Sequence, residues 1–378
     1  MNYVSCFSGI GGLEATQPPL AFCEADPVSA DVLRARHPET PIWNDVRDFD
    51  PPLADVVAGG WPCQDLSIAG RQAGLRGSRS GLLADMLEVA RRARAHTVVA
   101  ENVPNLLRLS AGREFSALLS GMADAGYRFV AWRVVNAREL GLAQNRRRLM
   151  IIASKEQAIP LVLFRPLPQP ADTPARVTTP ETAAGFYWTA GTHSINYSSG
   201  YVPAIKVGSS LGIASPPAVH YADVVRLVSP REALDLQGFL DVNVDAFPRS
   251  NDAYRAAGNA VPRPLGRWVL DGVLKGAPGA RPEWMETQCA LWTDPEGARL
   301  FPPSGVYCDG DVTPVRAKPA VLAVNLAAFL DADAPERLSQ RAARGLLGRL
   351  EKAGRLVPLD LLAVLNELAF VNDSGCAA

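Results

Sequence analysis

The sequence predicts an α/β protein built on a doubly wound, mostly parallel sheet, and three observations support this fold class. Over residues 3–153, short apolar segments alternate with segments of helical periodicity, as in successive βαβ units. Polar residues or glycines directly follow the apolar segments. The chain of 378 residues is 48% hydrophobic, which is ample for a core and suggests two or three domains. Because ligands of such sheets bind at the carboxyl ends of the strands, we expect a site at that rim.

The first expected strand, Tyr3–Phe7, runs into the glycine-rich turn Ser8–Gly12. We expect a helix to begin at Leu13 and to be ended early by Pro18-Pro19. Glycines in such a turn let a ligand approach the backbone closely, which favours a nucleotide-type site. The turn is not GxGxxG, so the dinucleotide fingerprint is not satisfied.

The next two expected strands each end at an acidic residue. Leu20–Cys23 ends at Glu24, and Ile42–Trp43 is followed by Asp45, with a helix over Val28–Arg36 between them. An acid that follows the second strand of such a sheet is well placed to bind ribose hydroxyls. We therefore expect both carboxylates at the same rim as the glycine turn.

A fourth strand, Asp55–Ala58, leads through two glycines to Trp61-Pro62-Cys63-Gln64. Pro62 stiffens the turn just before the sulfur. A free thiol has a pKa of roughly 8.5, so it needs a polar, partly exposed setting to act as a nucleophile. The Gly-, Ser- and Arg-rich segment 65–81 can supply that setting. The alternative, left open by local sequence, is that Cys63 is one more small buried residue.

The remaining elements of the first domain continue the alternation. A strand over Thr97–Ala100 ends at Glu101-Asn102, and a further strand over Leu149–Ala153 follows the segment Gln144–Arg148. We expect a helix over residues 82–95, before these two strands. Between the two strands we expect a helix over residues 115–125 and a strand over residues 129–135. Glu101 thus joins Gly9, Glu24, Asp45 and Cys63 on the expected rim.

The composition changes near Pro160. Residues 160–221 are rich in Pro, Thr, Ser, Gly and Tyr, which predicts an irregular, β-rich module. Helices are expected at 230–236, 252–272, 336–353 and 358–370, and a Pro- and Gly-rich connector follows Gly276. We divide the chain into a first domain (1–159), a small β-rich module (160–250), a return helix that completes the first domain (251–275) and a helical C-terminal extension (276–378).

Composition limits the classes of partner. The net charge is −1, so no global basic field indicates nucleic acid, yet residues 128–148 hold six Arg against one acid and residues 71–94 six Arg against two. A polyanion could bind such patches; the alternative is solvated helix faces. The six Cys are scattered without a CxxC pair and only four His are present, which argues against a metal site and fits a reduced cytoplasm. We find no signal peptide and no apolar run that could span a bilayer.

Six ordered motifs resemble the DNA cytosine-C5 methyltransferase family of bacterial or phage type. They span about residues 3 to 272 and occur in the family order, which favours a catalytic Cys63. The motifs are Phe7-Ser8-Gly9-Ile10-Gly11-Gly12, Pro62-Cys63-Gln64, Glu101-Asn102-Val103, Gln144-Asn145-Arg146-Arg147-Arg148, Arg231-Glu232 with Gln237-Gly238-Phe239, and Gly258-Asn259-Ala260-Val261-Pro262. The resemblance implies a class I, Rossmann-like methyltransferase fold.

The resemblance also implies the chemistry. Cys63 would add to carbon 6 of cytosine, so that carbon 5 can attack a methyl sulfonium. Glu101 would bind N3 and the exocyclic amine, and Arg148, with Arg146, would hold the base oxygen. The base must first be flipped out of the duplex. Alternatively, Glu101 is a helix-capping acid and the Arg cluster a phosphate clamp.

S-adenosyl-L-methionine, which yields S-adenosyl-L-homocysteine, is the cofactor that the resemblance implies. Glu24 would take the ribose hydroxyls and Asp45 the adenine amine, and Ala25 is smaller than the family's usual side chain at that position. The cofactor residues carried over are Phe7, Gly9, Ile10, Gly11, Gly12, Leu13, Glu24, Ala25, Asp45, Val46, Pro62, Leu82, Asn259, Ala260 and Val261. Residues proposed to bind DNA are Gln64, Ser67, Arg71, Gln72 and Arg79.

Residues 160–225 correspond to a target recognition domain, whose short length suggests a short target sequence. Candidates for groove contacts, which could equally be packing residues, are Tyr187, Trp188, Tyr197, Tyr201, Lys206 and His220. The extension after Gly276 matches no family motif; its apolar stripes predict a small helical accessory domain or a surface for association. Deleting residues 277–378 is then expected to leave methyl transfer measurable.

The leading hypothesis is an enzyme, a DNA (cytosine-5-)-methyltransferase that acts on a short duplex DNA sequence and needs no metal. It would work as a monomer in the bacterial cytoplasm or nucleoid, in a restriction–modification system with a cognate endonuclease or in a phage. One alternative uses the same chemistry on transfer RNA. A recognition module between the Arg cluster and Arg231-Glu232 favours DNA, whose sequence is read in the major groove. A third hypothesis is a catalytically idle DNA-binding protein on the same fold, against which Cys63, Glu101 and Arg148 argue.

Overall fold

The computed structural model describes residues 1–62, 81–168, 183–189, 195–207, 215–276, 304–308, 311–314, 325–331, 337–354 and 357–370. Two compact units make up the chain. The first unit comprises Met1–Leu140, Arg147–Gln169 and Ala260–Val321. The second comprises Gly141–Arg146, Pro170–Asn259 and Leu322–Ala378. Among the described residues, no helix is both long and apolar enough to cross a membrane.

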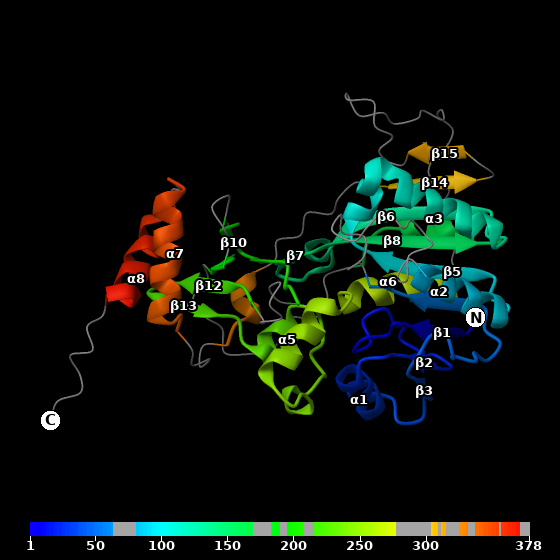
Figure 1. The fold of residues 1–378 in the computed structure, drawn as a ribbon, viewed down its shortest axis with the longest axis horizontal. Helices are drawn as coiled ribbons and strands as arrows, with labels where there is room; N and C mark the ends of the chain where they lie inside the picture. Colours follow the sequence, from blue (N-terminus) through cyan, green and yellow to red (C-terminus); the bar gives the residue numbers. More distant parts are fainter. Residues whose placement is uncertain are drawn as a thin grey trace. The chain divides into compact units, whose positions relative to one another are not determined.

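A sheet of nine described strands forms the first unit, in the order β15-β14-β6-β8-β5-β4-β1-β2-β3 (Figure 1). The five strands from β3 to β5 pair in parallel, whereas β8 lies antiparallel between β5 and β6. The bounds are β1 Tyr3–Cys6, β2 Phe22–Cys23, β3 Ile42–Trp43, β4 Val56–Gly59, β5 Thr97–Asn102, β6 Phe129–Asn136, β8 Arg147–Ser154, β14 Ser304–Cys308 and β15 Asp311–Pro314. The predicted fold class, a doubly wound and mostly parallel sheet, is confirmed.

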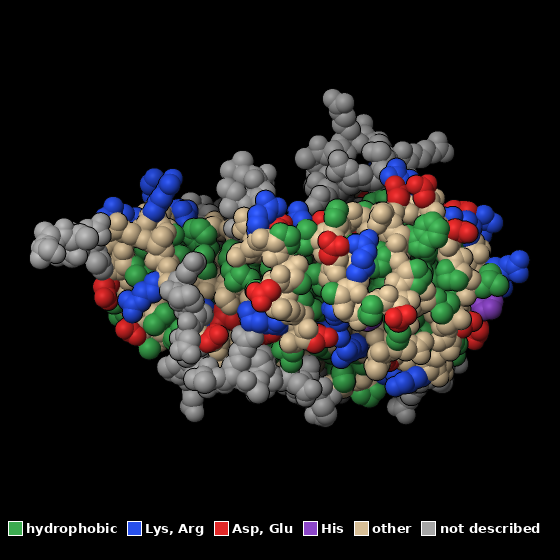
Figure 2. All heavy atoms as spheres, turned by 90° about the horizontal axis from the view of Figure 1, so that it is seen from below, with side chains coloured by type: hydrophobic (Ala, Val, Ile, Leu, Met, Phe, Trp, Pro, Cys, Tyr) green, Lys and Arg blue, Asp and Glu red, His purple; other side chains and the backbone are tan. Residues whose placement is uncertain are grey.

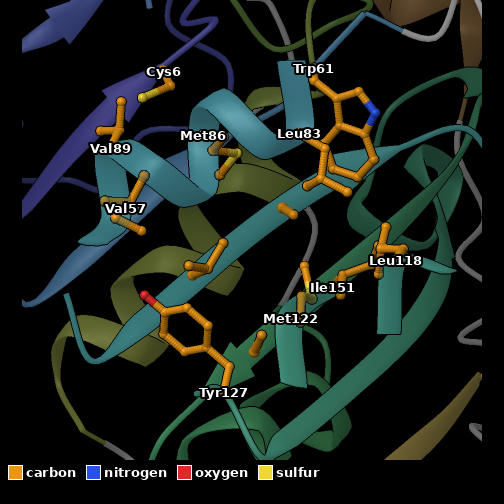
Figure 3. Packing of buried hydrophobic residues seen from close by; sticks show 14 of the residues in the cluster. Cys6, Val57, Trp61, Leu83, Met86, Val89, Leu118, Met122, Tyr127 and Ile151 are labelled. Atoms are coloured by element: carbon orange, nitrogen blue, oxygen red, sulfur yellow. The ribbon is translucent and has the colours of Figure 1, made fainter. Parts of the chain in front are cut away.

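Side chains alternate between the two faces of this sheet and build a core on each. On one face, Val57, Val98 and Ile151 pack with helices α2 (Gly81–Arg92) and α3 (Arg113–Asp124), as Figure 3 shows for part of the cluster. On the other face, Val56, Val99 and Ile152 pack with helix α6 (Arg263–Leu274). The remaining helices of this unit are α1 Pro27–Arg36 and the 3-10 turns η2 Pro104–Leu107, η3 Leu109–Gly112, η4 Ala137–Leu140 and η5 Ile159–Phe164.

The helix expected to begin at Leu13 does not form, and two hydrogen bonds explain why. The amide of Ala15 donates to the Tyr3 hydroxyl at 3.2 Å, and that of Thr16 to Oδ1 of Asp271 at 2.7 Å. The few residues before Pro18 are too short a stretch to offset the cost of nucleating a helix. The expected helix over 252–272 is likewise divided into α5 (Ser250–Asn259) and α6, because Pro262 disfavours helical backbone at the residue before it.

The second unit contains a four-stranded antiparallel sheet, ordered β10-β9-β12-β13, and a short parallel pair, β11-β7. Their bounds are β7 Gln144–Asn145, β9 Ala184–Phe186, β10 Ser198–Ser199, β11 Val202–Pro203, β12 Ala218–Tyr221 and β13 Val224–Leu227. Helix α4 (Pro230–Asp235) begins with a capping box, in which Ser229 and Glu232 each bond the other's backbone amide. The other helical segments are η6 Val244–Ala246, α5, η8 Leu326–Phe329, α7 Gln340–Lys352 and α8 Leu359–Phe370.

The C-terminal helices α7 and α8 share a core with the sheet of the second unit. Leu338, Leu346 and Leu365 pack in one cluster with Phe186 and Val225. The helices therefore take part in the core of the second unit. The extension also contributes β14, which pairs with β6 in the first unit. Sequence separation of this size leaves no local signal for either contact.

A buried ion pair fixes the extension to the second unit. Arg226 NH1 and NH2 donate to Glu232 Oε2 and Oε1 at 2.9 and 2.7 Å, and both side chains are at most 1% exposed. The Asp331 carbonyl accepts from Arg226 at 2.9 Å, and the Asp331 amide donates to Glu232 at 2.6 Å. The Leu338 amide also donates to the Val225 carbonyl at 2.8 Å. Removing the extension would leave these buried charges short of partners.

Candidate active site

The glycine-rich loop that follows β1 has the backbone of a ligand-binding turn. Phe7, Gly9 and Gly11 have φ angles of 53°, 55° and 87°. A Cβ on Gly12 would lie 2.4 Å from the Val261 carbonyl oxygen, and one on Gly266 would lie 2.0 Å from the Gly12 carbonyl oxygen. Loop and helix α6 are therefore in backbone contact, and only glycine fits at these positions.

Glu24 closes the glycine loop. Its Oε2 accepts a hydrogen bond from the Gly9 amide at 2.6 Å, and its Oε1 accepts from the Asp26 amide at 2.7 Å. Burial raises the pKa of Glu24. Asp26 in turn caps α1, since its Oδ2 accepts from the Ser29 amide at 3.0 Å. The predicted acid at the end of the second strand is thus in contact with the predicted glycine loop.

The other residues predicted to bind the cofactor lie in several different surroundings. Val46 belongs to the same apolar cluster as Trp61, and Phe7 and Leu82 pack against that cluster. Asp45 lies after β3, where Arg47 donates to both of its carboxylate oxygens and lowers its pKa. The structure places Ile10, Gly12, Leu13, Ala260 and Val261 among buried residues of the first unit, Ala25 and Pro62 at exposed positions, and Asn259 at the end of α5 in the second unit.

Glu14 is a buried carboxylate that the sequence analysis did not single out. Its side chain is 6% exposed, Oε1 accepts from the Ser5 hydroxyl at 2.9 Å, and Oε2 has no hydrogen-bond partner among the described residues. Burial raises the pKa of Glu14 to about 7, against the opposing charges of Arg36 and Arg263. The sequence signal that could have identified this residue is its position, two residues after the last glycine of the turn.

Glu101 and Arg148 form an ion pair at the ends of neighbouring strands. Arg148 Nε lies 2.8 Å from Glu101 Oε1, and the two side chains are 13% and 11% exposed. Oε2 of Glu101 faces Gly60, where an added Cβ would lie 2.8 Å from it. The registers Gly59↔Ala100 and Asn102↔Leu149 bring these residues together from β4, β5 and β8.

Asn102 holds the turn that leads toward Cys63. Its Nδ2 donates to the Trp61 carbonyl at 3.3 Å, and its Oδ1 accepts from the Val103 amide at 2.8 Å. Trp61 is itself buried, at 6% exposure. Cys63 and the predicted DNA-binding residues Gln64, Ser67, Arg71, Gln72 and Arg79 lie outside the described residues.

Arg146 is buried and bonded to two backbone carbonyls. Its side chain is 1% exposed, and its NH1 and NH2 donate to the carbonyls of Ile205 and Gly258 at 2.9 and 2.7 Å. These bonds give Arg146 a structural role, and contact with the base oxygen stays a prediction. Within the second unit, Arg146 joins the backbone at Ile205 to the backbone at Gly258.

Two buried amides that sequence reasoning missed complete this connection. Gln144 donates to the Leu236 carbonyl at 3.0 Å and accepts from the Ile205 amide at 2.9 Å. Gln237 donates to the Ala257 carbonyl at 2.7 Å. Both side chains are fully buried. Backbone-to-amide bonding of this kind has no local sequence signature beyond the motifs themselves.

Most candidates for groove contacts serve packing in the second unit. Tyr187 donates to the Ala204 carbonyl at 2.5 Å, and Trp188 donates to the Pro216 carbonyl at 3.0 Å. The Tyr197 hydroxyl bonds Nδ1 of His220 at 2.9 Å, and His220 is 3% exposed. The exposed member of the set is Lys206, whose Nζ lies 3.8 Å from the centre of the Tyr187 ring; Tyr201 is half-buried.

Cofactor and metal chemistry can be compared with the donors present. Within the described ranges, no group of three or more His, Cys, Asp or Glu is arranged to hold a metal ion. Cys6 and Cys23 are free, buried thiols at paired positions of β1 and β2. The carboxylates at strand ends and the glycine loop are instead the donors that a nucleoside uses.

Comparisons with known proteins found similarity over most of the chain. The family described as C-5 cytosine-specific DNA methylase matches residues 1–182. The Type II methyltransferase M2.BsuMI of Bacillus subtilis (strain 168) is 37% identical over 289 residues, which cover 71% of this chain and 74% of that protein. The Type II methyltransferase M.NgoBV of Neisseria gonorrhoeae is 27% identical over 191 residues, 45% of either protein. A solved mutant of Spodoptera frugiperda DNMT2 shares the fold, with a TM-score of 0.50 at 14% identity over 72% of this chain and all of that one.

Proposed function

Since this chain belongs to the C-5 cytosine-specific DNA methylases, we propose that it methylates carbon 5 of cytosine within a short duplex DNA sequence. The observation that carries the proposal is the pair formed by Glu101 and Arg148 beside Gly60. The pair offers two groups at the ends of neighbouring strands. The carboxylate can bind N3 and the exocyclic amine of cytosine, and the guanidinium can donate to its carbonyl oxygen.

The catalytic roles follow from the reactivity of the ring. The Cys63 thiolate forms a bond to carbon 6, and the electron pair of the 5,6 double bond moves toward carbon 5 and N3. Glu101 binds N3 and the exocyclic amine, so negative charge does not build up on the ring as the thiolate adds. Arg148 holds the base oxygen and keeps Glu101 in place. Once carbon 5 carries the methyl group, its proton passes to solvent, and the electron pair of that C–H bond restores the 5,6 double bond and expels the Cys63 sulfur as thiolate.

S-adenosylmethionine fits the first unit. The Phe7–Leu13 loop offers close backbone approach, Glu24 offers a carboxylate for ribose hydroxyls, and Val46 and Leu82 offer apolar surface for adenine. When bound, the cofactor supplies a methyl group on a sulfonium to carbon 5. Glu24 keeps Gly9 in its ligand-binding conformation through the 2.6 Å hydrogen bond.

Duplex DNA is favoured over transfer RNA because the second unit has a sheet and a core of its own. A separate module of this kind suits the reading of base edges in the major groove. The base would leave the duplex at a cost of about a few kcal/mol for unstacking. The similarity to Type II methyltransferases supports a place beside a restriction endonuclease.

Methylation mapping tests the proposal. The protein is incubated with S-adenosylmethionine and duplex DNA of mixed sequence, and protected cytosines are read by bisulfite sequencing with Cys63→Ala in parallel. Protection of cytosines in one short motif, only with Cys63 present, is expected. No protected cytosine with a folded protein that binds S-adenosylmethionine would refute the duplex substrate, and transfer RNA offered in competition would identify the alternative.

Trapping on DNA that carries 5-fluorocytosine tests the catalytic role of the thiol separately. Carbon 5 of that base bears no removable proton after methyl transfer, so the bond between sulfur and carbon 6 persists. A covalent complex that withstands denaturant is expected from the wild type and not from Cys63→Ala. Absence of the complex, with DNA binding retained, would favour an idle DNA-binding protein.

A further inference from the structure

Helix α7 has one face in the core of the second unit and an opposite face that carries basic residues. Ala343, Leu346 and Leu350 are buried against the sheet. Arg341, Arg344 and Lys352 recur at spacings of three and eight residues, which places them on the opposite side of the helix. All three are exposed, and Figure 2 shows Lys and Arg side chains gathered on the left, where Figure 1 draws α7 and α8.

The basic residues of this face outnumber the acids on helix α7 itself. Helix α7 holds Arg341, Arg344, Arg349 and Lys352 against the single acid Glu351. Among the described residues, the side chains of Arg341 and Lys352 take part in no hydrogen bond or ion pair. Arg344 donates to the Ala369 carbonyl at 2.7 Å and stays exposed. Two cations at the ends of the face are thus available to an anionic partner.

Two glycines lie between these cations. Gly345 and Gly348 fall on the same side of α7 as Arg341 and Lys352. A Cβ on Gly348 would meet nothing within 4 Å, and one on Gly345 would meet only the end of the Arg349 side chain, at 3.3 Å. No packing among the described residues requires glycine here, although glycine in a helix costs roughly 0.5–1 kcal/mol relative to alanine. The glycines leave a shallow strip where another backbone can approach the helix.

We propose that the basic face of α7 (Arg341, Arg344, Gly345, Gly348 and Lys352) binds the phosphate backbone of the DNA substrate. The inference rests on the proposed function and adds a contact surface in the extension, outside all the matched motifs. From residue 341 to residue 352 the helix rises about 16 Å, and duplex DNA carries a charge about every 1.7 Å along its axis. The face therefore meets several phosphates and contributes affinity without reading sequence.

The helix is rigid enough for this role because it is fixed to the recognition sheet. Arg349 donates to the carbonyl of Trp188 at 2.7 Å, and the buried leucines of α7 pack with Phe186. Phosphate contacts made by α7 would therefore also set the orientation of the sheet on the duplex. A free charged tail would add affinity but could not fix that orientation.

Salt dependence of DNA binding is the decisive measurement. The variant Arg341→Gln/Lys352→Gln removes two charges and keeps good helix formers. We compare the slope of log Kd against log salt concentration for a duplex with the target sequence. Each phosphate contact contributes about 0.9 to this slope, so the slope of the variant should be smaller than that of the wild type by roughly 1.8. The wild-type advantage should grow about tenfold between 200 and 50 mM salt, while the rate at saturating DNA stays unchanged.

A matched variant, Arg34→Gln/Lys275→Gln, removes the same charge from exposed positions of the first unit and should leave the slope at the wild-type value. Arg341→Lys keeps the charge at this position and should therefore keep the wild-type salt dependence. The proposal is overturned if the α7 variant keeps the wild-type slope, if both double variants lose the same slope, or if the α7 variant instead changes a concentration-dependent molecular mass, which would assign the face to a second copy. A wild type that methylates no duplex would instead refute the proposed function.

Discussion

Oε1 of Glu101 and Nε of Arg148 lie 2.8 Å apart at the ends of two antiparallel strands, with only 11% and 13% of their side chains exposed. Each charge offsets the cost of keeping the other away from water. The remaining carboxylate oxygen faces Gly60, which precedes Trp61 and Pro62 in the turn that leads to Cys63. The arginine therefore orients the carboxylate, whose second oxygen lies beside the backbone of this turn.

Glu101→Gln tests this arrangement. The amide keeps the shape but not the charge, so we expect single-turnover methylation to fall by about 10²–10⁴-fold. The DNA affinity should change little, because the substitution leaves the phosphate contacts intact. Quenched-flow methylation with excess enzyme gives the rate, and a thermal melt shows whether the variant is folded. A folded variant with the wild-type rate would remove Glu101 from the catalytic site.

Arg146→Lys separates a structural from a catalytic arginine. Lysine cannot reproduce the fork that bonds the carbonyls of Ile205 and Gly258, so we expect a loss of about 3 kcal/mol in the free energy of unfolding. Arg148→Lys is the matched control and should reduce turnover with a smaller effect on stability. Denaturant titration gives both free energies. If Arg146→Lys is as stable as the wild type but inactive, Arg146 contacts the base after all.

The contrast between these two arginines shows how far sequence reasoning reaches. The strands that carry Glu101 and Arg148 were predictable, because short apolar runs with polar ends are local signals. Whether an arginine two residues away is exposed or buried depends on carbonyls from residues 205 and 258, which no local pattern relates to it. The same holds for the pairing of β14 with β6 and for the absence of a helix after Leu13.

Gly266→Ala tests the backbone contact between α6 and the glycine loop. The new Cβ would lie 2.0 Å from the Gly12 carbonyl oxygen, and backbone atoms cannot move aside cheaply. We expect a loss of about 1–3 kcal/mol in stability and weaker binding of S-adenosylmethionine. Calorimetric titration and thermal melts measure the two effects.

Gly121→Ala is the comparison variant for that experiment. Gly121 lies within α3, and a Cβ there would meet nothing within 4 Å. It should therefore stabilise the protein by up to about 1 kcal/mol and leave cofactor binding unchanged. Equal effects of the two substitutions would contradict the close contact.

Glu14→Gln should change how stability depends on pH. The pKa of Glu14 is raised to about 7 from an ordinary value of 4.5, so the folded state binds a proton that the unfolded state has released between these values. The contribution of this carboxyl to stability is therefore lost progressively as pH rises from 4.5 to 7. The amide cannot ionise, so the decline should be shallower in the variant. Parallel declines across pH 5–8 would show that Glu14 does not titrate in this window.

Removing residues 322–378 should damage the second unit. The deletion uncovers Phe186 and Val225 and takes from Arg226 and Glu232 their contacts to Asp331. We expect rapid proteolysis within residues 183–259 and loss of target-specific methylation, in contrast to the expectation from sequence that methyl transfer survives deletion of residues 277–378. Limited proteolysis with mass spectrometry measures this, and a truncated protein with wild-type protection would contradict the shared core.

The second unit is assembled from three separate stretches of chain, with the last taken from the C-terminus. A gene segment that encodes only residues 170–259 would transfer the sheet without α7 and α8. In the recipient protein, the sheet would then pack against the recipient's own helices, and in this protein Leu346 and Leu365 would pack against a foreign sheet. An exchange of the proposed recognition unit between relatives, in evolution or in the laboratory, would therefore have to move two distant gene segments together. The second unit is therefore inherited whole only when residues 170–259 and 322–378 are inherited together.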